Sequence, residues 1–468
     1  MIRRPHLPRA AVLVAIATAL MLFAASAQAA RQRAGLGRAV AIEAQPRTQS
    51  PSNGATVSGE IKWRVSVHGA RPRRVVLAVD GRVRTQRARR RTATQTLDTT
   101  LLSDGPHTLT AIAILPDGTR SGRSKVTVNV DNSPRPPANG PHSVYWGAEI
   151  GDQLTGTQAP WDMNAVTKFE GMAQKKLSMI HFAAPWANCS SSPCTYYPFD
   201  ASMMNRVRSH GAIPFFSWAS QSIGQGGDPR SQPDFQLSDV IAGRHDAFLR
   251  SWATAAKNWG HPFFLRFNFE MNGTWFPWSE GVNGNQAGEY VAAWRHVHDI
   301  FTSVGATNAT WVWCPNVDPD HRFQSLAPLY PGDSYVDWTC LDGYNWGPGA
   351  GGAATSPSGW KSFDQLYKST YNEIADTIAP SKPMVIGEIG ATESGGSKAA
   401  WIQDALARAP SYPKMRGFLW FECFADGMDW PISTSASATS AFAAGIQSPA
   451  YTTNEFGNLD TSPIPPPS

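Results

Sequence analysis

Beyond residue 141 the chain alternates between short apolar segments and amphipathic segments, and this rhythm limits its possible folds more than any other feature. Eight apolar segments have strand character, at residues 144–150, 177–184, 212–218, 262–269, 310–314, 336–344, 384–389 and 417–422. Helical segments between them include 201–210, 239–259, 287–304, 363–378 and 399–409. Eight such alternations predict an α/β chain folded as a (β/α)8 TIM barrel. A doubly wound sheet has a similar rhythm, but no glycine-rich phosphate-binding pattern follows the first strand.

The stretch between residues 42 and 132 follows a different pattern. From 61 to 67 every second residue is apolar, which is the period of a β-strand with one buried face. Turn pairs such as Asp80-Gly81 and Asp117-Gly118 separate further strand-like segments. This stretch predicts a small all-β immunoglobulin-like sandwich, and it resembles the bacterial immunoglobulin-like modules attached to secreted enzymes. The proline-rich stretch 133–141 predicts a stiff linker to the (β/α)8 domain at 142–468.

The first residues have the features of an export signal. Three arginines precede an apolar run at 10–25, and Ala27-Gln28-Ala29 matches a signal peptidase site. We therefore expect a signal peptide at 1–29, a basic spacer at 30–41 and a secreted, extracellular protein. An uncleaved membrane anchor is disfavoured because the run is short, and we expect no membrane span after cleavage.

Charge is divided unevenly along the chain. Residues 31–140 carry 19 Lys+Arg against 7 Asp+Glu, whereas residues 141–468 carry 19 against 29. Such a division predicts two modules with different partners. The arginine-rich run at 82–91 is the candidate contact for an anionic cell-wall polymer, although a solvated basic loop explains it more simply. Nucleic acid is not an expected partner of an exported protein.

Five cysteines in an exported chain permit disulfides. Cys189 and Cys194 flank a short loop with turn residues, so we predict a local disulfide there. Cys314, Cys340 and Cys423 lie in or just after predicted strands and are interpreted as buried thiols, with a second bridge among them left open. No cysteine or histidine spacing fits a zinc site, and we expect neither a metal nor an organic cofactor.

Two predicted strands end in a glutamate, Glu270 after 262–269 and Glu388 within 384–389. Residues that end the strands of such a barrel meet at its carboxyl-end rim, where active sites lie. Two carboxyl groups roughly 5–5.5 Å apart can hydrolyse a glycosidic bond with retention of configuration. A single glutamate could be a salt-bridge partner on the rim. Two of them, with Trp275 and Trp278 beside the first, favour a glycoside hydrolase.

Three stretches carry a more specific resemblance: FLRFNFEMNGTWFPW at 264–278, YVDWTCLDGYNWG at 335–347 and KPMVIGEIG at 382–390. They resemble the signature stretches of glycoside hydrolase family 26, which contains β-mannanases. The resemblance implies that Glu270 is the general acid/base and Glu388 the nucleophile. It also implies supporting or substrate-binding roles for further residues: Arg266, Asn272, Trp275, Trp278, Trp313, Tyr344 and Trp420.

The supporting residues have expected contacts. By this resemblance Arg266 would orient or pair a carboxylate, and Tyr344 would donate a hydrogen bond to the nucleophile. The remaining aromatic residues would stack on sugar rings, Trp420 directly under the cleaved sugar: Trp275, Trp278, Trp313 and Trp420.

One position departs from the family. The residue directly before the acid/base is usually histidine, and here it is Phe269. An apolar neighbour raises the pKa of a carboxyl group, which suits a general acid, but it also weakens the transfer of mannan specificity. Further acidic candidates for the site or its rim are Glu149, Asp342, Glu422 and Asp426. Asp318, Asp320 and His321 predict a solvated loop more readily than a cation site.

The sequence therefore predicts a secreted, monomeric endo-β-glycanase, similar to endo-1,4-β-mannosidases, that hydrolyses β-1,4-mannan by double displacement. The alternatives are a lichenase or β-xylanase of the same fold and a non-catalytic carbohydrate-binding barrel. The hydrolase hypothesis requires that Glu270 and Glu388 meet across one sugar. A separation of their side chains well above roughly 10 Å would exclude a retaining hydrolase.

Overall fold

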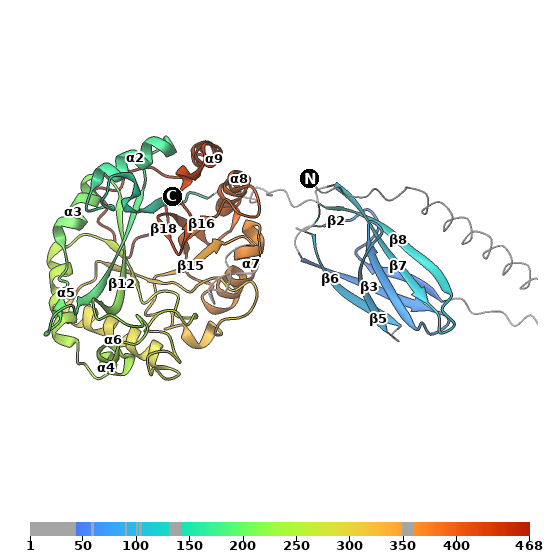
Figure 1. Ribbon diagram of the computed structural model, residues 1–468, viewed down its shortest axis with the longest axis horizontal. Helices are drawn as coiled ribbons and strands as arrows, with labels where there is room; N and C mark the ends of the chain where they lie inside the picture. Colours follow the sequence, from blue (N-terminus) through green and yellow to red (C-terminus); the bar gives the residue numbers. More distant parts are fainter. Residues whose placement is uncertain are drawn as a thin grey trace, which may run out of the picture. The chain divides into compact units, whose positions relative to one another are not determined.

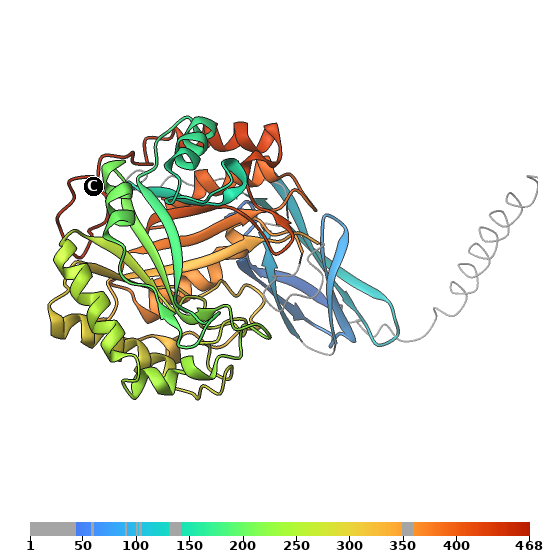
Figure 2. The ribbon, with the colours of Figure 1, turned by 60° about the vertical axis from the view of Figure 1, so that its left-hand side comes forward.

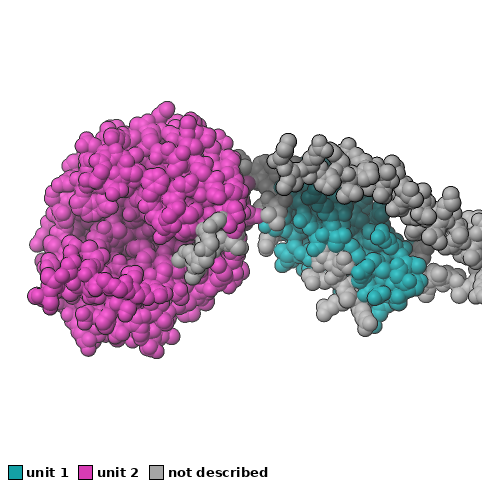
Figure 3. All heavy atoms as spheres, in the orientation of Figure 1, with its two compact units in different colours: residues 1–132 teal, residues 133–468 magenta. Residues whose placement is uncertain are grey.

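The computed structural model describes residues 44–57, 60–88, 91–99, 102, 105–130, 142–348 and 359–468. The chain divides into two compact units, Met1–Asn132 and Ser133–Ser468 (Figure 1 and Figure 3). The predicted signal peptide, basic spacer and proline-rich linker lie outside the described residues.

The first unit consists of two β-sheets. One has the order β1-β3-β6, with β1 (Gln45–Ser50), β3 (Glu60–His68) and β6 (Thr92–Asp98). The other has the order β2-β8-β7-β4-β5, with β2 (Thr56–Val57), β8 (Arg120–Val130), β7 (Gly105–Ile114), β4 (Arg74–Val79) and β5 (Arg82–Ala88). The apolar positions of the alternating segment, Trp63, Val65 and Val67, are buried in one cluster with Val75, Leu77 and Leu109 of the other sheet. Both sheets therefore bury one shared apolar face, whereas the immunoglobulin-like relationship stays a prediction.

The second unit is a closed barrel of eight parallel strands, and this predicted fold is confirmed. The order is β10-β12-β13-β14-β15-β16-β17-β9, with β9 pairing back to β10 and a short antiparallel strand, β11 (Thr195–Tyr196), added outside β10. The eight strands are β9 (Tyr145–Ile150), β10 (Met179–Asn188), β12 (Ile213–Ile223), β13 (Phe263–Phe267), β14 (Ala309–Trp313), β15 (Trp338–Asn345), β16 (Met384–Ala391) and β17 (Met415–Glu422).

Helices surround these strands (Figure 2). They are α2 (Met163–Ala173), α3 (Ala201–Ser209), α4 (Leu237–Ile241), α5 (Asp246–Trp259), α6 (Glu289–Val304), α7 (Phe363–Glu373), α8 (Lys398–Arg408) and α9 (Ala436–Ile446). The single helix predicted at 239–259 is wrong, because Gly243 has a φ of 78° and separates α4 from α5. In the part of the chain that the structure describes, no helix combines the length and apolarity needed to cross a membrane.

Alternate residues of each strand face either the helices or the barrel interior. At the start of the strands the interior residues are apolar and form one cluster: Tyr145, Met179, Phe215, Phe264, Val312, Trp338, Val385 and Leu419. The C-terminal segment closes this end, since Ile464 joins the cluster and its N–H donates to Thr310 Oγ1 at 2.9 Å. Trp338 Nε1 donates to the carbonyl oxygen of Ile464 at 2.8 Å. The opposite, carboxyl end of the strands carries the polar residues.

Two disulfides form in the described chain. Cys189–Cys194 is the predicted local bridge. Cys314 and Cys340 are also bonded, so their interpretation as buried thiols is wrong. Both face the barrel interior, Cys314 directly after β14 and Cys340 within the neighbouring β15, with Cα atoms 4.2 Å apart. This proximity was not evident from their separation in sequence. Cys423 is the free cysteine.

Candidate active site

Glu270 and Glu388 approach each other at the carboxyl end of the barrel. Single carboxylate oxygens of Glu270, Asp342 and Glu388 all lie within 4.8 Å of one another. Glu388 belongs to β16, whereas Glu270 follows β13 in a tight turn in which Asn268 and Glu270 have φ values of 42° and 53°. The Glu270 N–H donates to the carbonyl oxygen of Cys314 at 2.6 Å, which fixes this turn against the next strand. The two acids are therefore well within the limit of roughly 10 Å that a retaining pair must meet.

Arg266 connects the polar residues. Its side chain is fully buried, Nη1 donates to Asp342 at 2.6 Å, and Nη2 donates to Glu388. Nε donates to Ser217 Oγ at 2.7 Å, so every edge of the guanidinium has a partner. Although burial opposes ionisation, Asp342 and Glu388 raise the pKa of Arg266. One fixed positive charge thus faces two carboxyl groups.

Glu388 is held at both oxygens. Arg266 Nη2 donates to Oε1 and the Tyr344 hydroxyl donates to Oε2. Burial, and then the charge of Glu388, raises the pKa of Tyr344 well above its ordinary value, so the phenol keeps the proton that it donates. The preceding residue is Gly387, where a Cβ would lie 2.6 Å from an Asp342 oxygen and 2.8 Å from Arg266 Nη1. Only glycine leaves room for this packed charge cluster.

Glu270 has uncharged partners instead. Trp275 Nε1 and Asn316 Nδ2 each donate to one of its oxygens. Burial, and then the negative charge of Glu388, raises the pKa of Glu270 to about 7, while the two hydrogen bonds act in the opposite direction. A carboxyl group with this pKa is populated in both protonation states near neutral pH, as an acid/base requires.

Asn316 was missed from the sequence. Its backbone N–H donates to Asn272 Oδ1 at 2.8 Å, and Asn272 Nδ2 donates to its carbonyl oxygen at 2.9 Å. Asn272, a predicted support residue, therefore orients Asn316 rather than Glu270 itself. The alternation along strand five, in which 312 and 314 face inward, extends to 316 and could have indicated this residue.

A second polar chain approaches Arg266 from the first strands. His181 Nδ1 lies 2.7 Å from Glu149, and His181 Nε2 lies 2.6 Å from Ser217 Oγ, which accepts from Arg266. His181 and Ser217 are fully buried, whereas a quarter of the Glu149 side chain is exposed. Burial raises the pKa of Glu149, but the larger combined effect of His181 and Arg266 lowers it. Glu149 thus belongs to the site, and the sequence did not indicate His181 or Ser217.

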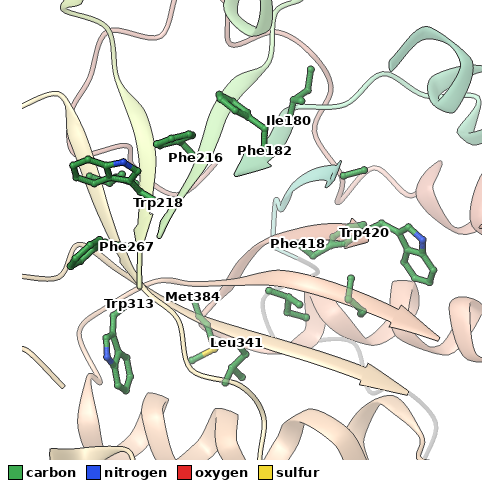
Figure 4. Packing of buried hydrophobic residues seen from close by; sticks show 14 of the residues in the cluster. Ile180, Phe182, Phe216, Trp218, Phe267, Trp313, Leu341, Met384, Phe418 and Trp420 are labelled. Carbon is green, nitrogen blue, oxygen red and sulfur yellow. The ribbon is translucent and has the colours of Figure 1, made fainter. Parts of the chain in front are cut away.

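Two predicted sugar platforms are wrong. Trp313 and Trp420 are buried on the helix side of their strands, as Figure 4 shows. Trp313 Nε1 donates to the carbonyl oxygen of Leu329, and Trp420 packs edge-on against Phe442 of α9. The period of two explains the error, because their neighbours Val312 and Leu419 are the residues that face the interior.

The two other predicted tryptophans differ from each other. Trp278 is fully buried, stacks on Phe276 at 4.4 Å and donates to the Phe269 carbonyl oxygen, so in this structure it supports the loop and presents no face to a sugar. Trp275 is half-buried and contacts Glu270. The Phe269 ring lies against Arg266, with the guanidinium carbon 4.1 Å from its centre.

An aromatic cluster that the sequence did not indicate lies beside Tyr344. Trp430 packs at 4.8 Å from both Tyr344 and Trp346, and Phe421 packs at 5.4 Å from Tyr344. Trp346 also lines an open groove of about 700 Å³. The other residues that line it are Thr392, Ser394, Phe424, Ala425, Asp426, Gly427, Met428 and Asp429. Figure 3 shows the second unit hollowed on one face.

The remaining acidic candidates have separate places. Asp426 lines the groove, whereas Glu422 is fully buried beneath the loop that follows β17. Asp318 accepts from the N–H groups of Arg322 and Phe323, and Asp320 pairs with Lys361 at 3.0 Å. The hydrogen bonds of Asp318 stabilise the 318–323 loop internally, and the ion pair joins this loop to the segment before α7. Glu270, Asp342 and Glu388 are close enough to share a metal ion, but Arg266 already balances charge in this cluster.

Comparisons with known proteins agree with this geometry. Residues 238–389 match the sequence profile of Glycosyl hydrolase family 26. The chain is 32% identical over 305 residues to Endoglucanase H of Acetivibrio thermocellus, covering 64% of this chain and 30% of that protein. It is 30% identical over 194 residues to a Mannan endo-1,4-beta-mannosidase of Bacillus subtilis, covering 39% of this chain and 46% of that protein. The chain thus spans less than half the length of either relative.

Solved structures show the same fold. A modular endo-beta-1,4-mannanase from Cellulomonas fimi superposes with a TM-score of 0.50 and 17% identity, over 68% of this chain and 74% of that one. The catalytic domain of an endo-beta-1,4-mannanase from Bacillus sp. JAMB-750 gives a TM-score of 0.50 at 18% identity, over 67% and 88%.

Proposed function

Because the barrel belongs to glycosyl hydrolase family 26, we propose that the protein is a retaining endo-β-glycanase. The observation that carries the proposal is the pair of glutamates in contrasting surroundings. Glu388 accepts from a guanidinium and a phenol, whereas Glu270 accepts from two neutral donors and has a pKa raised, by burial first, to about 7.

In the proposed mechanism Glu388 attacks the anomeric carbon while Glu270 protonates the departing oxygen. Arg266 and Tyr344 aim the attacking carboxylate. The glycosyl–enzyme bond is then broken by a water molecule that Glu270 deprotonates, so the acid of the first step is the base of the second. Asn316 and Trp275 hold Glu270 in place for both steps.

We propose β-1,4-mannan as the polymer. The motif resemblance and the names of the Bacillus subtilis relatives support it, whereas the name of the Acetivibrio thermocellus relative favours a β-glucan. A panel of mannan, mixed-linkage β-glucan and β-xylan tests the choice, with new reducing ends as the readout. The anomeric form of the first product, followed by NMR, tests retention, and an initially inverted product would refute the mechanism.

The alternative is a barrel that binds carbohydrate without cleaving it, and Phe269 is the observation that favours it. An apolar ring here occupies the position before the proposed acid, against Arg266. Binding of an oligosaccharide by the intact chain, with no new reducing ends from any of the three polymers, would establish this alternative.

We further propose that the protein is secreted as a monomer and that its immunoglobulin-like first unit contacts an anionic cell-wall polymer. Exposed basic side chains on this unit, including Arg82, Arg84, Arg123 and Lys125, support the contact. Sedimentation of the full chain with an anionic wall polymer, compared with a variant in which these four residues are glutamate, tests it. Equal sedimentation of wild type and variant would refute the contact with the polymer. An exported protein that still begins at residue 1 would refute removal of the signal peptide at 1–29.

A further inference from the structure

A buried lysine and a buried glutamate hold one peptide group from its two sides. Lys398 Nζ donates to the carbonyl oxygen of Pro431 at 2.8 Å, and the N–H of Ile432 donates to Glu422 Oε2 at 2.8 Å. The carbonyl group of Pro431 and the N–H group of Ile432 belong to the same peptide unit. Lys398 also donates to the carbonyl oxygen of Asp429 and, at 3.0 Å, to Thr434 Oγ1, so all three of its protons are used.

Neither residue takes part in the proposed chemistry. Burial of either charged side chain has an unfavourable desolvation free energy. Lys398 and Glu422 have no exposed surface. Burial lowers the pKa of Lys398 to about 8 and raises that of Glu422 to about 7, with nearby opposite charges only partly offsetting it. Apolar side chains would fill such a space at lower cost, so buried charges of this kind are a candidate device for fixing one backbone arrangement.

The residue that they fix is Trp430. It stands between the two carbonyl groups that Lys398 binds, those of residues 429 and 431. Its ring packs against Tyr344 and Trp346, and a Cβ added at Gly390 would lie 3.2 Å from it. The Tyr344 hydroxyl donates to Glu388. A continuous set of contacts therefore runs from Lys398 to the attacking carboxylate.

We propose that Lys398 and Glu422 are positioning residues of the hydrolytic site, which hold Trp430 against Tyr344 and thereby fix the orientation of Glu388. The proposal rests on the hydrolase function proposed above. We call Lys398 and Glu422, together with the peptide group that they bind, the clamp. Lys398 lies at the start of α8 and Glu422 at the end of β17, so the clamp joins a helix and a strand of the barrel to the loop that carries Trp430.

The chain offers a matched control in Lys175. Its Nζ also makes three hydrogen bonds, here to the carbonyl oxygens of Ile446, Ser448 and Tyr451, but near the end of the barrel away from the acids. Lys398→Met and Lys175→Met therefore each remove three hydrogen bonds of a lysine, from different places in the barrel. We expect Lys398→Met to lower kcat by about 10- to 100-fold, as misplacement of a reacting group by about 1 Å does, and Lys175→Met to leave kcat within about twofold in the folded protein.

A double-mutant cycle separates positioning from general support. If Lys398 acts through Trp430, kcat of the Lys398→Met/Trp430→Ala variant will equal that of Trp430→Ala alone. Glu422→Gln keeps an acceptor for the Ile432 N–H and is expected to retain most activity, whereas Glu422→Met is expected to resemble Lys398→Met. Additive losses in the cycle, or equal losses in both lysine variants, would overturn the proposal.

A readout independent of turnover distinguishes this proposal from the hydrolase proposal. Trp346 and Trp430 lie 4.8 Å apart at 88°, so their coupled electronic transitions contribute to the circular dichroism spectrum. Lys398→Met is expected to remove the same spectral component as Trp430→Ala, and Lys175→Met to retain it. A wild-type protein that cleaves no polymer would refute the hydrolase, whereas an unchanged spectrum in Lys398→Met would refute the clamp.

Discussion

The two ends of the barrel interior use the same strands for opposite purposes. At the amino end, alternate residues such as Phe264, Trp338 and Val385 form a dry cluster closed by Ile464. At the carboxyl end, positions further along these strands carry Arg266, Asp342 and Glu388. Stability and chemistry are thus separated along the axis of the barrel.

The largest expected effect is at the polar end. Glu388→Ala and Glu270→Ala should each lower kcat/KM by about 10²- to 10⁴-fold, because each removes a group that the proposed mechanism needs in the transition state. Initial rates of reducing-end release measure the loss. Thermal unfolding within a few degrees of wild type would show that both variants fold, and near-normal rates for either would refute its assigned role.

At the apolar end we expect the reverse. Ile464→Ala leaves a cavity among buried side chains and should lower the free energy of unfolding by about 2–5 kcal/mol. The kcat of the remaining folded protein should not change. Denaturant unfolding measures the stability, and rates corrected for the fraction of folded protein measure kcat. A large loss of kcat at unchanged stability would show that this end of the barrel also serves catalysis.

The pKa of Glu270 predicts that activity and stability both fall with rising pH, but over different pH ranges. Because the acid must be protonated, kcat/KM should fall as the pH rises above about 7. The pKa is raised above its ordinary value in the folded state, so the folded protein binds the proton more tightly and loses stability as the pH rises from about 4.5 to about 7. Relative to Glu270→Gln, wild type should lose up to about 1.4 kcal/mol per pH unit in this window. Parallel unfolding curves at all pH values would contradict this sign.

The smallest expected effect comes from the outward-facing tryptophans. Trp313→Phe and Trp420→Phe should change KM and kcat by less than about twofold and cost about 1 kcal/mol of stability, as core substitutions do. Trp430→Phe, by contrast, should affect turnover. A strong rise of KM in Trp420→Phe would restore the platform role that its burial argues against.

The strand count and closed barrel were predictable because each strand and its helix repeat a local pattern. The approach of Glu270 to Glu388 also followed, since parallel strands end at one rim. The prediction that Trp313 and Trp420 face the substrate was wrong for a different reason. A one-residue error in register reverses the side on which a side chain lies, and the motif resemblance did not set that register.

Contacts between distant strands were not predictable from local pattern. The Cys314–Cys340 bridge and the relay from Glu149 through His181 to Ser217 depend on which strands are neighbours and on their stagger. Trp430 belongs to a loop, where no period indicates a direction. The signal peptide, the linker and the immunoglobulin-like assignment stay predictions.

The shared guanidinium of Arg266 has a consequence for anyone redesigning this barrel. Because a single cation serves Asp342 and Glu388 at once, neither acid can be exchanged without changing the charge balance felt by the other. Engineering of a new specificity would therefore have to keep Arg266, Asp342 and Glu388 together and unchanged, and confine substitutions to the surrounding loops.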